Sequence, residues 1–188
     1  AKDGDLRNTG TIAGRELVKI DASTIDNLAG RISGGEVDLT AKIDINNLGG
    51  TVDARDALKL NAGRDINVRT TTGTGELGNT GIDRVAGLYV SNPGGRLVAS
   101  AGRDVNLFGA VVANEGKGGY TSITAKNDLN LGTVATSSTA VALGQKVSGH
   151  STTGEELGTA TTPDGTTLLR AERDANVRQA TIDAGSGY

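Results

Sequence analysis

A six-residue phrase recurs along the chain and constrains its fold more than any other feature. Each copy holds Ala, one or two small or basic residues, Asp, an apolar residue and Asn, and clear copies begin at Ala41, Ala62, Ala101, Ala125 and Ala171. In the first third, apolar residues also return at intervals of about 20 residues, in three series: Ile12, Ile32, Val52; Ile25, Ile45, Ile66; and Ile20, Leu39, Leu60. This interval is typical of a solenoid, in which neighbouring units bury a shared core.

Within a unit, apolar and polar residues alternate over short stretches such as residues 36–41 and 57–62. A period of two puts Val37, Leu39 and Ala41 on one face, which predicts half-buried strands. Gly, Asn and Asp fall between these stretches and suit tight corners. No window has the period of an amphipathic helix, and the phrase of leucine-rich repeats is not repeated. We therefore expect an all-β fold, a right-handed parallel β-helix that forms one rod segment over residues 1–188.

The composition favours a narrow aliphatic core over a compact globule. The 188 residues include 29 Gly and no Cys, Met or Trp, and the aromatic residues are one Phe and three Tyr. A globule of this size usually packs several large aromatic side chains in its core. The net charge of −3 and the scattered basic residues argue against nucleic acid as a partner. No apolar run approaches the roughly 20 residues of a membrane span, so no span is expected in this segment.

The repeat is interrupted twice. The interval from Asp65 to Asp104 is 39 residues, and the interval from Asp128 to Asp174 is 46 residues, about twice the ordinary spacing. Both intervals contain a Gly-Glu-Leu-Gly-like phrase, and in both a proline stands 11 residues before the second Asp. We expect two excursions, at about residues 70–91 and 135–162, that leave the rod on the same side as hairpins or loops.

The polar residues of the phrase have structural interpretations. One Asp stands in each clear copy, at Asp44, Asp65, Asp104, Asp128 and Asp174, and the simplest interpretation is a turn residue that bonds to its own backbone. The repeated Asn has two interpretations that the sequence leaves open. It either forms a hydrogen-bonded ladder along the rod or tolerates the backbone geometry of a corner.

Other candidates for chemistry are few. His150 is the only histidine and there is no Cys, which excludes a zinc site and a Cys–His pair by inventory. A Ser–His–Asp triad is possible by inventory, but nothing in the sequence positions it. Tyr89 and Tyr120 are interpreted as packing or surface residues, and residues 116–119 lack the spacing of a phosphate-binding loop. We assign no catalytic, cofactor-binding or metal-binding residue and expect no cofactor.

Two stretches resemble the repeats of filamentous haemagglutinins. They read Gly-Arg-Leu-Val-Ala-Ser-Ala-Gly-Arg-Asp-Val at residues 95–105 and Ile-Asp-Asn-Leu-Ala-Gly-Arg-Ile at residues 25–32. This family contains large adhesins, haemolysins and contact-dependent growth inhibition toxins, which Gram-negative bacteria export by two-partner secretion. The resemblance covers nearly the whole chain and implies a virulence protein that is secreted or held at the bacterial surface. The family's secretion domain carries Asn-Pro-Asn, whereas Asn92-Pro93 is followed by Gly94, so we expect a stretch of rod downstream of that domain.

Two functions are weighed. The first is a structural rod segment, not an enzyme, that extends and presents distal domains of an adhesin or a toxin-delivery filament. This function implies a receptor on a host or neighbouring bacterium and, for the full-length protein, an outer-membrane secretion partner. The alternative is a carbohydrate-active β-helix enzyme, a polysaccharide lyase or hydrolase, which needs carboxylates that converge on a groove. The carboxylates here are spread along the chain, which favours the rod.

Overall fold

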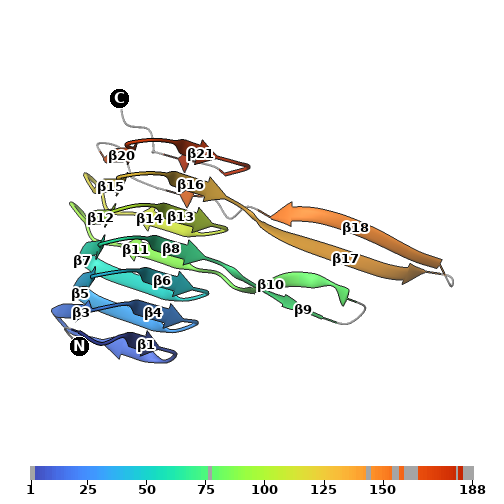
Figure 1. Cartoon of the computed structure of the whole chain (residues 1–188), viewed down its shortest axis with the longest axis horizontal. Helices are drawn as coiled ribbons and strands as arrows, with labels where there is room; N and C mark the ends of the chain where they lie inside the picture. The colour runs from blue at the N-terminus through green and yellow to red at the C-terminus, as the bar shows by residue number, and fades with distance from the viewer. Residues whose placement is uncertain are drawn as a thin grey trace.

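The protein is all-β and is built mainly from two parallel sheets. The structure, a computed structural model, describes residues 3–75, 78–142, 145–153, 157–158, 165–180 and 182–183, and these ranges contain no α-helix. Sheet A has seven strands, and sheet B has nine (Figure 1). A four-stranded antiparallel sheet, sheet C, projects to one side of the stack in the same view. A short parallel pair joins β19 (Leu157–Gly158) to β22 (Ile182–Asp183).

Sheet A collects one short strand from each level of the stack. Its strands are, in spatial order, β1 (Leu6–Asn8), β4 (Ile25–Leu28), β6 (Ile45–Leu48), β8 (Ile66–Arg69), β13 (Val105–Phe108), β16 (Leu129–Gly132) and β21 (Ala175–Val177). Spatial order follows chain order throughout, because equivalent strands of successive repeats lie next to one another.

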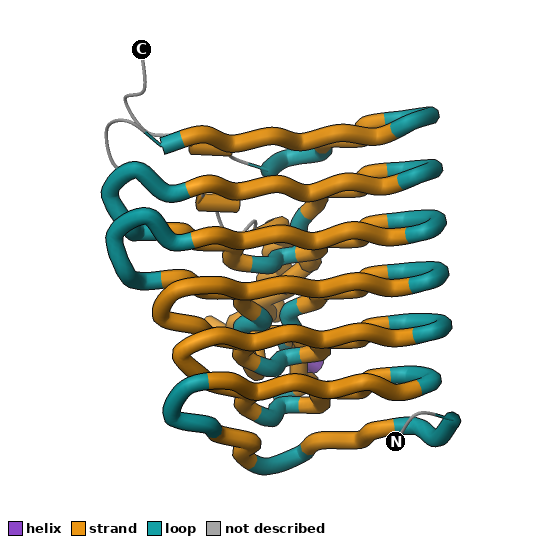
Figure 2. Tube along the Cα trace, turned by 90° about the vertical axis from the view of Figure 1, so that its left-hand side faces the viewer, coloured by secondary structure: helices purple, strands orange, loops and turns teal. Residues whose placement is uncertain are grey.

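Sheet B collects the other strands of the stack, including the longest ones. At the first levels β2 (Thr11–Ala13) and β3 (Leu17–Ala22) both pair with β5 (Arg31–Ala41), which pairs with β7 (Thr51–Ala62). Further along, β11 (Gly87–Val90) and β12 (Arg96–Ala101) both pair with β7, and they continue to β14 (Val111–Asn114), β15 (Tyr120–Ala125) and β20 (Thr166–Ala171). Figure 2 shows the resulting levels, which lie one above another and are joined by turns at both ends.

The core lies between the sheets and is made of aliphatic columns. Ile25 pairs with Ile45 and Ile45 with Ile66, and all three are at most 1% exposed. The other two predicted series are also in register and confirm the prediction, with Ile12 and Ile20 only partly buried. These two residues lie in the first level, where a neighbouring level covers one side only. Each fully buried Ile or Leu contributes roughly 1.5–3 kcal/mol relative to an exposed one.

The predicted alternation is confirmed in β5. Val37, Leu39 and Ala41 are buried, whereas Asp38 and Thr40 between them are half-exposed on the outer face. The same pattern in neighbouring strands gives sheet B one face toward the core and one face toward solvent.

Sheet C is formed by two hairpins that are distant in sequence. The first joins β9 (Thr71–Thr74) to β10 (Thr80–Arg84), and the second joins β17 (Val134–Ala142) to β18 (Gln145–Thr153). Thr80 pairs with Ser137 and joins the hairpins, with the Thr80 N–H donating to the Ser137 hydroxyl at 3.2 Å. The first hairpin is shorter than the expected excursion at residues 70–91, because β11 already lies in sheet B between β7 and β14.

Candidate functional site

The repeated Asp residues form a column at the corner before the sheet A strands, and four of the five (Asp44, Asp65, Asp104 and Asp128) bond to the next level. The carboxylate of Asp44 accepts hydrogen bonds from Nε of Arg64 at 2.8 Å and from the backbone N–H of Asp65 at 3.2 Å. Nη2 of Arg64 pairs with its second oxygen. Asp65 is held in the same way by Arg103 and by the N–H of Asp104. We expected each Asp to bond to its own turn, whereas the bonds seen at these four residues reach the following repeat.

The arginine of the phrase is the residue that sequence reasoning missed at this corner. Arg64, Arg103 and Arg173 each stand immediately before the Asp of their own level and reach back to the Asp of the level before. The signal was present in the sequence, since Arg-Asp occurs in three of the five clear copies. At Asp104 the donor is Asn127 instead, at 2.7 Å.

Two of the corner carboxylates, those of Asp44 and Asp128, have a lowered pKa. The hydrogen bond from Arg64 lowers the pKa of Asp44 against the opposing effect of burial. The hydrogen bond from Arg173 lowers the pKa of Asp128 in the same way. A carboxyl group with a lowered pKa is a poor general acid near neutral pH. This chemistry suits a structural ion pair better than proton transfer.

Asparagine forms two ladders along the stack, and the outer one confirms the ladder interpretation of the phrase. On the outer face of sheet A, the side-chain amide of each Asn donates to the equivalent residue of the level before it, at 2.8 or 2.9 Å. The series begins at Asn176, passes through Asn130, Asn106, Asn67 and Asn46, and ends at the carboxylate of Asp26. The second ladder is buried and runs the other way, from Asn8 to Asn27 at 2.8 Å and from Asn27 to Asn47 at 2.7 Å. Its signal in the sequence was the spacing of 19 and 20 residues between these three residues.

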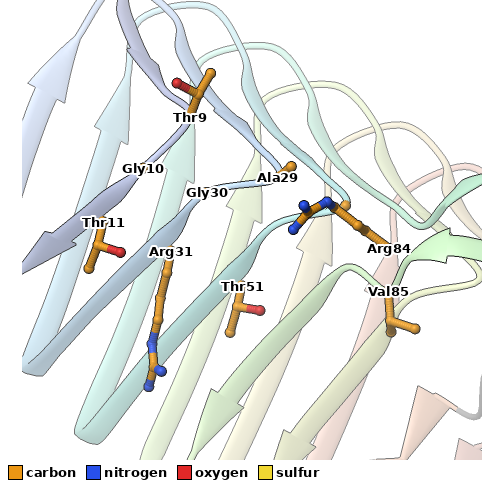
Figure 3. A pocket seen from close by; sticks show the side chains of 10 residues that line it. Thr9, Gly10, Thr11, Ala29, Gly30, Arg31, Thr51, Arg84 and Val85 are labelled. Atoms are coloured by element: carbon orange, nitrogen blue, oxygen red, sulfur yellow. The ribbon is translucent and has the colours of Figure 1, made fainter.

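A polar hollow of about 540 Å³ lies where the first hairpin meets the stack (Figure 3). One side is formed by Thr11, Arg31 and Thr51, which are the first residues of β2, β5 and β7. Arg84 comes from the hairpin side. Arg31 already donates to the carboxylate of Asp53 at 2.8 and 3.1 Å, which raises its own pKa. The lining contains no carboxylate and no histidine. The threonine hydroxyl groups of the lining therefore have no carboxylate or imidazole beside them to act as a general base.

The remaining candidates of the sequence lie apart from one another. The guanidinium of Arg96 lies 5.8 Å from the ring centroid of Tyr120, and the ring of Tyr89 covers Gly87 of its own strand. Residues 116–119 form a turn in which the N–H of Gly119 donates to the carbonyl of Gly116 at 2.9 Å. The side chain of His150 lies outside the described residues.

Among the residues that the structure describes, no group of three or more His, Cys, Asp or Glu side chains is arranged to hold a metal ion. No helix in the described part of the chain is long and apolar enough to cross a membrane. No family model, curated protein or solved structure matches the chain.

Proposed function

We propose that the chain is a structural rod segment, built as a right-handed parallel β-helix, that extends and presents other parts of a large bacterial surface protein. The observation that carries the proposal is the bonding of each repeat to the next. Core, corner and outer face all consist of columns of equivalent residues, and the corner Asp and both Asn ladders bond between levels. Such a chain gains length by adding repeats.

The β-helix is supported by the alternation of the chain between two parallel sheets that share one core. Strands of sheet A and sheet B follow one another along the chain, and turns of a few residues connect them. The right hand follows the strong preference of connections between parallel strands. Sheet C then projects from the rod as two hairpins inserted between coils.

A role without catalysis is supported by the distribution of the acidic groups. The corner carboxylates are spread over successive levels, and arginine or asparagine side chains of the next level hold four of them. A polysaccharide lyase or hydrolase instead needs carboxylates that converge on the substrate. That enzyme remains the alternative function.

The biological setting comes from the resemblance to filamentous haemagglutinin repeats. It favours a protein that is secreted or held at the cell surface, as an adhesin or as a filament that delivers a contact-dependent toxin. The partners that this setting implies are a surface receptor on a host or a neighbouring bacterium and an outer-membrane secretion partner. We expect a receptor to contact the hairpins or the outer faces, because the corners are occupied by contacts between levels.

Deletion of whole repeats tests the architecture. Removing residues 25–44, one unit of 20 residues, puts Ile45 in the place of Ile25, so the variant should stay folded and become shorter by one strand spacing of about 4.8 Å. Removing residues 25–34 is the matched control, because half a unit puts the first level out of register with the levels that follow, and it should cost more structure and stability than removal of the whole unit. Circular dichroism and small-angle scattering read out both variants. Equal loss of structure in both variants would contradict the repeat architecture.

A cleavage assay tests the alternative function. The chain is incubated with a panel of acidic and neutral polysaccharides, with and without Ca²⁺, and released reducing ends are measured. The rod proposal expects no release above a buffer control. Release that disappears in an Asp65→Asn, Asp104→Asn double variant would restore the enzyme.

A further inference from the structure

The outer face of sheet A carries a second column beside the asparagine ladder, and its middle is unlike the rest of the surface. In register order this column contains Leu28, Leu48, Arg69, Phe108 and Gly132. Arg178 follows at the next level, where its N–H donates to the carbonyl of Leu131 at 2.9 Å. Phe108 is the only Phe of the chain, and it is half-exposed here.

Phe108 stands between two hollows of the same face. A side chain at Gly132 would meet the ring of Phe108 at 2.9 Å, so the ring lies across the glycine. The hollow on one side, of about 470 Å³, is lined by Asn46, Leu48, Asn67, Arg69, Asn106 and Phe108. The hollow on the other side, of about 230 Å³, is lined by Phe108, Asn130, Leu131, Asn176 and Arg178. The two hollows form a track along the stack with an aromatic ring at its centre.

The asparagine ladder gives this track regularly spaced polar groups. A side-chain amide has two N–H donors and a carbonyl oxygen with two lone pairs. Each inner rung uses one N–H toward the level before it and accepts one N–H from the level after it. One donor and one acceptor per rung are therefore left for a ligand, and the half-exposed side chains of Asn67, Asn106 and Asn130 present them. Rungs recur at the strand spacing of about 4.8 Å.

The track is positively charged although the chain carries a net charge of −3. Arg69 and Arg178 are exposed, and neither has an ion-pair partner among the described residues. No Asp or Glu lines either hollow. Two guanidinium groups without a carboxylate nearby favour an anionic ligand, and their planar donors fit a carboxylate in a bidentate way.

We propose that this track, the Phe108 track, binds an acidic polysaccharide that runs along the stack. The apolar C–H face of one sugar ring packs on the ring of Phe108, whose π face favours such contact. Hydroxyl groups of successive sugars bond to the asparagine rungs, and carboxylates of uronic acid units pair with Arg69 and Arg178. A linear polymer fits because the polar groups repeat along a line, and a single aromatic ring with few cations is a poor match for nucleic acid. This binding role is separate from the role of the rod.

Binding of polygalacturonate to the intact chain, measured by calorimetry and affinity electrophoresis, tests the proposal. Phe108→Ala should weaken binding at least tenfold, and Arg69→Gln and Arg178→Gln at least threefold each, with less effect of these two at high salt. Phe108→Leu keeps an apolar group over Gly132 and should still weaken binding, which separates the aromatic face from folding. Arg170→Gln, which changes an exposed arginine of β20 in sheet B, is the matched control and should bind like the wild type.

Three results would overturn the proposal. The first is no binding of polygalacturonate by a chain that circular dichroism shows to be folded. The second is an equal loss of binding in Arg170→Gln and Arg69→Gln, which would mean general attraction to positive charge. The third is binding of neutral dextran as strong as that of polygalacturonate, or binding of dextran sulfate alone, because either result would remove the role of the carboxylates.

Discussion

Asn46 and Asn47 are neighbours in sequence and belong to the two different ladders. Replacing each by Ala therefore compares the stability that an exposed ladder and a buried ladder contribute. Asn47 is fully buried. Its amide accepts from Asn27 at 2.7 Å and donates to the carbonyl groups of Gly50 at 2.8 Å and Gly87 at 3.3 Å. Asn46 is half-exposed, donates to Asp26 at 2.8 Å and accepts from Asn67 at 2.8 Å.

The expected losses of stability differ because water can replace the partners of only one of these residues. A hydrogen bond contributes roughly 0.5–1.5 kcal/mol net, and a buried polar group left without a partner costs about 1–3 kcal/mol. Three buried bonds therefore predict that Asn47→Ala lowers the free energy of unfolding by about 3 kcal/mol. At Asn46, water reaches the freed groups, and we expect a loss of about 1 kcal/mol or less.

Urea unfolding followed by circular dichroism measures both variants, and thermal unfolding provides a second readout. For a chain of this length, 1 kcal/mol corresponds to about 2–4 °C in Tm, so Asn47→Ala should melt about 6–12 °C lower. Equal losses in the two variants would refute the reasoning, because they would show that burial of the inner ladder adds nothing. A loss below about 1 kcal/mol for Asn47→Ala would refute it as well.

Three further outcomes are expected. The pKa of Asp44 is lowered in the folded state, so the ionised carboxylate contributes stability at pH values above the unfolded-state pKa of about 3.9. This contribution is lost as the pH falls through the lower pKa of the folded state. The difference in free energy of unfolding between the wild type and Asp44→Asn should therefore shrink in an acid titration. Asn127→Arg should restore the arginine of the phrase opposite the carboxylate of the previous level and raise the free energy of unfolding by up to about 1 kcal/mol, a gain that high salt should remove. Limited proteolysis with mass spectrometry should find the first cuts in the hairpins of sheet C, and early cuts within residues 25–66 would contradict this expectation.

The core was predictable because two independent periods in the sequence determine it. Alternation along a strand decides which side chains face inward, and the interval of about 20 residues decides which of them stack. Together they placed Ile25, Ile45 and Ile66 in one buried column, as the register of β4, β6 and β8 shows. The outer asparagine ladder follows from the same two periods, since equal positions on parallel strands lie side by side.

The contacts that sequence reasoning missed depend on geometry between levels. The arginine before three of the five Asp residues could be seen, but its partner lies 20 or more residues back, and only the stacking of corners brings the two together. The excursions raise a similar difficulty. Leu88 follows its column neighbour Val52 by 36 residues instead of 20, so β11 was assigned to the first excursion although it belongs to sheet B. The two excursions were expected on the same side, but nothing in the sequence predicts that Thr80 pairs with Ser137 and joins them.

The composition of the phrase follows from what a column of identical residues can tolerate. An amide both donates and accepts, so Asn stacks on Asn and gains a bond at every level. A carboxylate only accepts, and a column of Asp at the strand spacing of about 4.8 Å would repel itself. The arginine beside it removes this conflict, because Arg103 donates to Asp65 of the level before and its Nε also lies 3.3 Å from Asp104 of its own level. Arg-Asp-x-Asn is therefore a unit that can be repeated along a stack without unbalanced charge, and each of its three polar residues bonds to a neighbouring level.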